Sequence, residues 1–193
     1  MLKIIVPANE FWNEKEQRFE YIASEELNLE HSLISISKWE SKWHIPFLND
    51  GKRIEKFKKT PEMIRDYVRC MCVNKLQDPR ILYCLTNDNM KAINDYINDP
   101  MTATSFADRP TDPNQIVART SNYTTNEIIY YQMVELGIPL EWEKRHLNRL
   151  LTLIRVVSEK KAEANDPKRA GKNTGSQYRT PHIPKSRPHI PRR

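Results

Sequence analysis

Glycine, cysteine and long apolar runs are scarce in this sequence. Of its 193 residues only 4 are glycine, and two of these lie after residue 163. This scarcity argues against a glycine-rich phosphate-binding loop and against the turn-rich chain of an all-β fold. No apolar run approaches the roughly 20 residues that cross a bilayer, and the apolar N-terminal stretch is too short for a signal peptide. We therefore expect no membrane segment and a cytoplasmic protein.

The sequence also lacks the motifs of common catalytic and metal sites. Cys70, Cys72 and Cys84 are odd in number and form no C-x-x-C pair, so we expect them to be small core residues. None of the 5 histidines stands at metal-ligand spacing from another ligand. The phosphate-loop, dinucleotide, zinc-protease and serine-hydrolase motifs are missing. We expect no enzyme activity, no cofactor and no metal.

Positive charge is concentrated near the C-terminal end. The chain has 31 basic and 25 acidic residues, a net charge of +6. Residues 164–193 hold 8 of the basic residues and 1 acid, which leaves 23 basic and 24 acidic residues in 1–163. The basic character therefore belongs to the last segment, and it is weak evidence that the rest of the chain binds nucleic acid.

We predict a single, mostly helical domain at 1–163 and a basic, proline-rich, disordered tail at 164–193. About 160 residues are enough to bury a substantial core. In the tail, Pro-His-Ile-Pro occurs at 181–184 and again at 188–191, each time followed by a basic residue. Prolines three apart, with few apolar neighbours, favour extended polyproline II over packing.

Two basic segments are candidates for electrostatic contact with an anionic partner. One is the run 52–59, in which a phenylalanine stands among lysines as in some nucleic-acid-binding patches; a solvated loop is the alternative. The other is the tail, which could become ordered on an acidic or phosphate-bearing surface. The candidate residues are Lys52, Arg53, Lys56, Lys58 and Lys59 in the run, and Arg179, Lys185, Arg187, Arg192 and Arg193 in the tail.

The N-terminal residues have the pattern of strands. Residues 2–6 and 18–22 are rich in β-forming side chains, and the polar segment 13–17 between them predicts a β-hairpin. Leu27 and Leu29 alternate with polar residues and predict a third strand. Spacing then becomes helical up to Lys42, although the run Ile-Ser-Ile-Ser leaves a strand as the alternative.

Helical spacing and capping signals mark the rest of the domain. Thr60 and Thr86 are predicted N-caps, and Thr124 with Glu127 has the pattern of a capping box. Gly137 is predicted to end the helix that follows. The predicted helices cover 33–42, 61–74, 87–98, 125–136 and 140 into the 160s. The class is α+β and helix-dominant: an N-terminal β-hairpin or small sheet packed on about five helices, with a disordered C-terminal tail.

Three blocks of the sequence carry a family resemblance. They are LNLEHSLISISKWESKWHIPFL at 27–48, NDPMTATSF at 98–106 and IIYYQMVELGIPLEWEKRHLNRLLTLIRV at 128–156. Their order and wording resemble the tail assembly chaperones of long-tailed, siphovirus-like bacteriophages. The resemblance implies a non-enzymatic binding protein in the host bacterial cytoplasm. Its partners would be the tape measure protein, which it keeps soluble during tail morphogenesis, and the tail tube protein, with no nucleic acid and no membrane.

The resemblance suggests where a partner binds and what else the gene encodes. We expect a partner-binding surface at Trp39, Trp43, Trp142 and Leu147; ordinary core packing is the alternative for each. The C-terminal segment departs from the family. In this class of families a ribosomal frameshift near the end of the gene can add a second domain, so this chain could be the unshifted product beside a longer, frameshifted form. The alternative functions are a virion structural or head-tail connecting protein, and a nucleic-acid-binding accessory factor that uses the basic tail.

Overall fold

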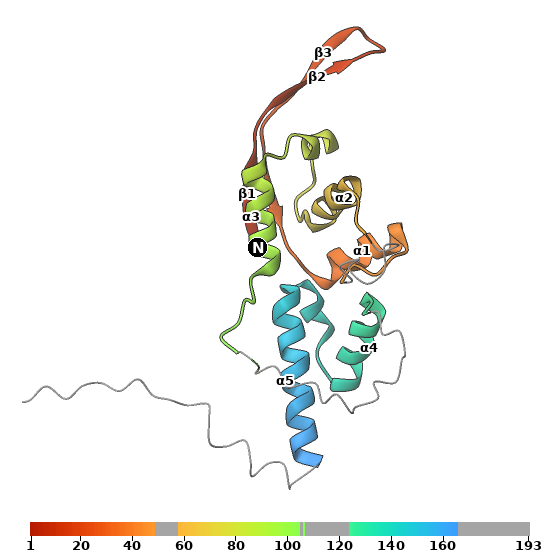
Figure 1. The fold of residues 1–193 in the computed structure, drawn as a ribbon, viewed down its shortest axis with the longest axis vertical. Coiled ribbons are helices and arrows are strands. Elements are labelled where there is room, and N and C mark those ends of the chain that lie inside the picture. Colours follow the sequence, from red (N-terminus) through yellow and green to blue (C-terminus); the bar gives the residue numbers. More distant parts are fainter. Residues whose placement is uncertain (49–57, 105, 107–123, 166–193) are drawn as a thin grey trace, which may run out of the picture. The chain divides into compact units, whose positions relative to one another are not determined.

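A computed structural model describes residues 1–48, 58–104, 106 and 124–165 (Figure 1). The chain divides after Val156 into two compact units, and the account below concerns the first, Met1–Val156. This division falls inside the last helix, which continues past the domain end predicted at 163. The predicted tail lies outside the described residues except for its first two positions. No helix in the described ranges is long and apolar enough to span a bilayer.

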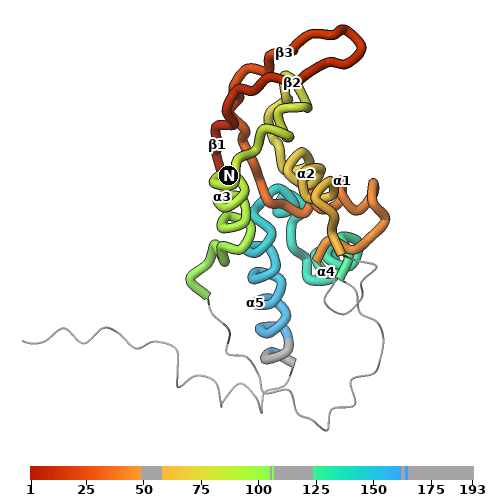
Figure 2. The backbone as a smooth tube through the Cα atoms, turned by 45° about the horizontal axis from the view of Figure 1, so that its top comes forward, coloured from red at the N-terminus to blue at the C-terminus, as the bar shows by residue number. Residues whose placement is uncertain are grey.

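The four strands form one long antiparallel ribbon in two ladders. β1 (Leu2–Val6) pairs with β4 (Glu25–Leu29), and β2 (Asn9–Asn13) pairs with β3 (Arg18–Ile22). The second ladder continues the register of the first, because the residue numbers of facing partners add up to the same value in both. Neither side of the ribbon therefore has an extra residue between the two ladders. Figure 2 shows the two antiparallel segments of this ribbon, which run side by side from β1 to the turn between β2 and β3. The strand predicted around Leu27 and Leu29 is confirmed.

The predicted pairing of 2–6 with 18–22 is wrong. The turn lies where it was expected, but β2, which the sequence pattern did not indicate, takes the place beside β3. The sequence pattern does not predict β2 because its five residues, Asn-Glu-Phe-Trp-Asn, are polar at both ends, and none of their side chains is fully buried. The first strand consequently pairs with the fourth.

The ribbon turns over between its two ladders. In β1 the buried side chains stand at even positions, Ile4 and Val6, whereas in β2 the less exposed side chains are at odd positions, Phe11 and Asn13. Side chains along a strand point alternately to its two faces. The change from even to odd positions therefore means that the ribbon turns over near Pro7, so that its opposite face is towards the protein in the outer ladder. One face of the outer ladder is therefore left to solvent.

Two helices begin at their predicted caps, Thr60 and Thr86, and a third begins at Ser32, for which no cap was predicted. α1 (Leu33–Trp43) starts at Ser32, whose hydroxyl accepts from the amide of Ser35. α2 (Pro61–Met71) and α3 (Asn87–Asn98) start at Thr60 and Thr86, each with a side-chain cap. Between them lies the 3-10 helix η2 (Pro79–Tyr83). These local signals work because the capping residue satisfies amides in the first turn of its own helix.

Tertiary hydrogen bonds shift two helix boundaries. α2 ends at Met71 rather than near Asn74, because the Met71 carbonyl accepts from the amide of Glu30 at 2.9 Å and the chain then runs beside β4. The predicted helix from Leu140 is two elements, the 3-10 helix η3 (Leu140–Lys144) and α5 (Leu147–Asn165). The break comes where the amide of Leu147 donates to the carbonyl of His31 at 2.7 Å.

α4 (Asn126–Leu136) ends at Gly137 as predicted. Gly137 has a φ of 73° and its amide reaches back to Met133 and Val134, the left-handed C-cap that favours glycine. The capping box expected at Thr124 does not form; the helix begins one residue later than predicted, at Asn126, and Thr125 at its N-cap makes no side-chain cap bond.

Strands and helices share one core. Cys70 and Cys84 are buried in it as expected, while Cys72 is half-buried. The class is α+β and helix-rich, as predicted. The largest fully buried side chains are Leu27, Leu29, Leu33, Ile36, Trp39, Met71, Ile81, Ile93, Ile129, Met133, Leu147 and Leu150.

Candidate protein-binding surfaces

The outward face of α4 is apolar and exposed. Ile128, Tyr131 and Val134 stand three residues apart and are 41%, 65% and 69% exposed, while Ile129 and Met133 on the other side of the helix are fully buried. A helix on the surface of a soluble domain normally has polar residues on its outward face. α4 is apolar on both sides, as a helix covered by a further element would be. We call Ile128, Tyr131 and Val134 the α4 face.

A buried carboxylate on α1 fixes the start of α4. Glu40 accepts hydrogen bonds from the backbone amide of Asn126 at 2.9 Å and from its side-chain amide at 2.6 Å. Its second oxygen accepts from the amide of Phe47 at 2.6 Å. Glu40 therefore supplies the cap that the sequence pattern assigned to Thr124 and Glu127, and it ties α4 to α1.

The outer ladder presents a second apolar surface. Trp12 and Phe19 face each other across β2 and β3, with ring centroids 5.0 Å apart in an edge-to-face arrangement. Tyr21 lies on the same side of the ladder, and all three side chains are between 48% and 68% exposed. These three residues form what we call the hairpin aromatic face. Exposed aromatic clusters of this kind mark interaction sites more often than scattered single residues do.

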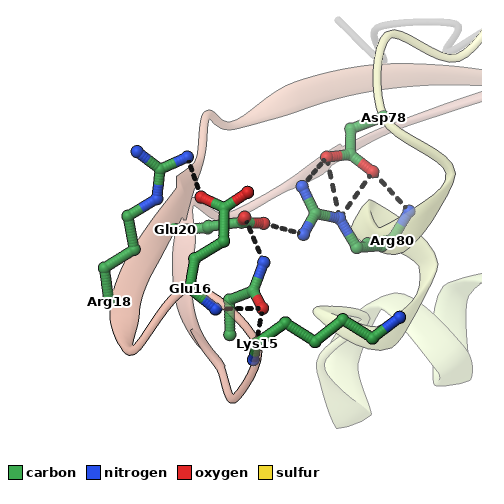
Figure 3. A network of polar contacts seen from close by, with 7 residues as sticks. Lys15, Glu16, Arg18, Glu20, Asp78 and Arg80 are labelled. Atoms are coloured by element: carbon green, nitrogen blue, oxygen red, sulfur yellow. Dashed lines mark hydrogen bonds and ion pairs between the residues drawn. The ribbon is translucent and has the colours of Figure 1, made fainter.

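Ion pairs tie the other side of the hairpin to η2. The Arg80 guanidinium contacts the carboxylate of Asp78, at 2.7 Å for its closest pair of atoms, and also that of Glu20 (Figure 3). Glu20 accepts a further hydrogen bond from the Asn13 side chain at 2.6 Å. Hydrogen bonds from Arg80 lower the pKa of both Glu20 and Asp78. The contact holds the ladder by one side and leaves the hairpin aromatic face open.

The four predicted partner-binding residues do not form one surface. Trp39 and Leu147 are fully buried, and the Trp39 indole donates to the carbonyl of Met63 at 2.8 Å. Trp43 and Trp142 are half-buried. The spacing of Trp39 and Trp43 does place them on one face of α1, but that face packs against α2. Trp39 and Leu147 are therefore core residues that a partner cannot reach, which corrects the expectation for these two.

Most of the predicted electrostatic contacts lie outside the described residues. Lys58 is exposed, and the Lys59 ammonium lies 4.7 Å from the centre of the Phe47 ring. The remaining candidates stay predictions. They are Lys52, Arg53 and Lys56, together with Arg179, Lys185, Arg187, Arg192 and Arg193 of the tail.

Two buried histidines form a polar centre where β4, α1 and α5 meet. The imidazoles of His31 and His146 lie 5.2 Å apart, and both residues are buried. His31 bonds through Nδ1 with the hydroxyl of Tyr67, and Nε2–H of His146 donates to the carbonyl of Tyr96 at 3.0 Å. Burial lowers the pKa of His31 to about 3, with the nearby His146 adding to the effect, and burial also lowers the pKa of His146. Both rings are therefore neutral structural groups at pH 7.

Metal chemistry finds no support in the described ranges. They contain no cluster of three or more histidine, cysteine or acidic side chains placed to hold an ion. Burial raises the pKa of Cys72 to about 12 and also raises the pKa of Cys70, so neither thiol is activated as a nucleophile. The features that stand out for function are the two exposed apolar surfaces.

Comparison with known proteins does not identify a relative. No protein-family model matches the chain, and neither a curated protein nor a solved structure matches it. The resemblance to the tail assembly chaperones of long-tailed bacteriophages therefore stays a prediction that rests on the three sequence blocks.

Proposed function

We propose that this protein is a bacteriophage tail assembly chaperone that binds the tape measure protein reversibly and keeps it soluble. The observation that carries the proposal is the α4 face, an apolar helical surface with no covering element among the described residues. A long, mostly helical tape measure protein exposes apolar stripes before the tail tube surrounds it. An apolar helix face can cover such a stripe by helix packing, as helix-in-groove binders do.

The size of the α4 face suits a reversible complex. Fully burying one exposed large apolar side chain is worth about 1.5–3 kcal/mol, and the three side chains of the α4 face are 41%, 65% and 69% exposed, so each can contribute part of that. Part of that gain is lost to ordering the partner and to the entropy of association. A modest net affinity is what a chaperone needs, because it must release its client when the tube polymerises.

Co-expression with the tape measure protein of the same genome tests the proposal. The double variant Tyr131→Ser, Val134→Ser removes two exposed side chains of the α4 face. Val73→Ser, Tyr83→Ser is the matched control, because these residues are as exposed but lie elsewhere. We expect the wild type and the control to keep the tape measure protein soluble and to co-elute with it in size exclusion, and the α4 variant to lose both effects. Unchanged solubility without any complex for the wild type would refute the chaperone assignment.

The hairpin aromatic face favours a second candidate, a virion structural or head-tail connecting protein. Among the described residues β2 and β3 pair with no further strand, and a two-stranded ladder with exposed aromatic residues can join the sheet of a neighbouring subunit. Mass spectrometry of purified particles separates the two functions. A chaperone is absent from the mature virion, whereas a structural protein is present in stoichiometric amount.

A further inference from the structure

We propose that the pocket between η3, α3 and the start of α5 binds a small oxyanion of the phosphate class. The pocket has a volume of about 200 Å³, and Lys144, Arg145 and Arg149 line it together with a single acid, Glu30. Since a water molecule occupies roughly 30 Å³ of the liquid, there is room for a tetrahedral anion with part of its hydration shell.

Two acids beside these cations already have hydrogen-bond or ion-pair partners. Glu30 accepts from the Tyr96 hydroxyl at 2.7 Å and pairs with the ammonium of Met1 at 2.9 Å. Glu143, next to Lys144 in the chain, accepts from the Tyr130 hydroxyl at 2.8 Å. No carboxylate of the described ranges pairs with Lys144, Arg145 or Arg149. Three cations therefore line this pocket with one carboxylate, and none of the three is paired with a described carboxylate.

A second pocket shows that unpaired cations are not the rule on this surface. It has a volume of about 230 Å³, lies over α2 and η2, and is also lined by basic residues. Three of its four lining cations are paired there: Lys42 and Arg69 each contact Asp66 at 2.7 Å, and Arg80 pairs with Asp78 at 2.7 Å, whereas Arg65 lies 4.9 Å from the centre of the Tyr83 ring. The difference between the two pockets points to an external counter-ion at the first.

Side chains, and not the terminus of α5, would hold the anion. The first amides of α5 are already occupied: Leu147 donates to the His31 carbonyl at 2.7 Å and Asn148 to Nδ1 of His146 at 3.3 Å. The Arg149 guanidinium lies 5.9 Å from the centre of the Trp142 ring, a contact that limits its positions. Guanidinium groups match a phosphate with two parallel hydrogen bonds, which an ammonium group cannot do.

Titration of the full chain with inorganic phosphate at constant ionic strength, followed by NMR chemical shifts, tests the site. Three double variants are compared with the wild type. Arg145→Gln, Arg149→Gln removes both guanidinium groups and their charge. Arg145→Lys, Arg149→Lys keeps the charge but replaces each guanidinium group with an ammonium group. Lys75→Gln, Lys91→Gln removes the same charge from exposed positions outside the pocket.

We expect saturable shifts at residues around the pocket in the wild type and in the Lys75, Lys91 control. The affinity should fall about tenfold or more in the glutamine variant at positions 145 and 149, and by a smaller factor in the lysine variant. Shifts that never saturate, or an equal loss in the control, would overturn the proposal, because they would indicate general screening of charge.

A short single-stranded oligonucleotide as a second probe distinguishes the source of the phosphate. If the oligonucleotide competes with inorganic phosphate, and this competition disappears in the Arg145→Gln, Arg149→Gln variant, the site would be assigned to nucleic-acid phosphates. Saturable phosphate binding without such competition would assign it to a free anion. Both results support an oxyanion site, and neither depends on the tape measure protein.

Discussion

Glu40 and Asn126, 86 residues apart in the chain, form the hydrogen bonds that start α4. One carboxylate oxygen of Glu40 accepts from both the backbone and the side-chain amide of Asn126. The other accepts from the amide of Phe47. This residue of α1 thus connects three segments, and it determines how the α4 face is presented.

Replacing Glu40 with glutamine should destabilise the protein. The amide of a glutamine side chain would place donors against N–H donors, and an unsatisfied buried polar group costs about 1–3 kcal/mol. Urea unfolding should show this loss. Glu141→Gln on the exposed surface is the control and should change the free energy of unfolding by less than about 0.5 kcal/mol. Equal stability of the two variants would show that Glu40 does not cap α4.

Protonation of the buried histidine pair should destabilise the fold in mild acid. The folded-state pKa of His31 is about 3, against 6.5 for an exposed histidine, and the pKa of His146 is also lowered. The unfolded chain therefore binds more protons below pH 6.5, and stability falls as the pH drops from there towards 3. The slope is up to about 1.4 kcal/mol per pH unit for each histidine.

Urea unfolding at pH 7 and pH 5 measures this effect. His31→Gln should reduce the loss of stability between the two pH values. His44→Asn removes an exposed histidine whose left-handed φ of 54° asparagine tolerates, and it should leave the loss unchanged. A pH dependence identical in all three proteins would contradict the assignment to His31.

Asp66 should be a second stabilising carboxylate, between α1 and α2. It is buried and accepts from the Lys42 ammonium at 2.7 Å and the Trp43 indole at 2.8 Å. Burial alone would raise the pKa of Asp66, but these hydrogen bonds outweigh it and lower the pKa. Asp66→Asn should cost about 1–3 kcal/mol in urea unfolding, because the cations lose their partner. Asp95→Asn, on an exposed face of α3, is expected to be nearly neutral, and comparable losses would argue against a specific role for Asp66.

Loss of Arg80 should loosen the hairpin locally. Arg80 contacts Glu20 of β3, so Arg80→Gln removes the ion pair between the outer ladder and η2. Hydrogen exchange should become faster for amides of β2 and β3 and stay unchanged in β1 and β4, whose side chains enter the core. Arg65→Gln, which removes the stacking of a guanidinium on Tyr83, is the control. Unchanged exchange in β2 and β3 would mean that the ion pair does not hold the hairpin.

Local features were predictable where a residue acts within its own turn. Thr60 and Thr86 cap the helices that follow them, and Gly137 ends α4, because each signal needs only neighbouring backbone atoms. The helix-rich α+β class followed in the same way from the spacing of apolar residues. The α4 face could have been found as well, because every residue of 128–134 except Gln132 is aliphatic, aromatic or methionine, a pattern typical of a helix that is covered on both sides.

Interactions between distant segments could not be read from the order of residues. Nothing in the sequence assigns β1 to β4, reverses the ribbon at Pro7 or sends Glu40 to Asn126. The same limit applies to the tryptophans. Their spacing placed Trp39 and Trp43 on one face of α1, but it did not show whether that face meets solvent or α2. Helix and strand propensity, capping and apolar periodicity act over a few neighbouring residues, so they can be identified in the sequence. Burial and pairing depend on which surfaces meet after the chain has folded, so they were settled by the packing of the whole domain.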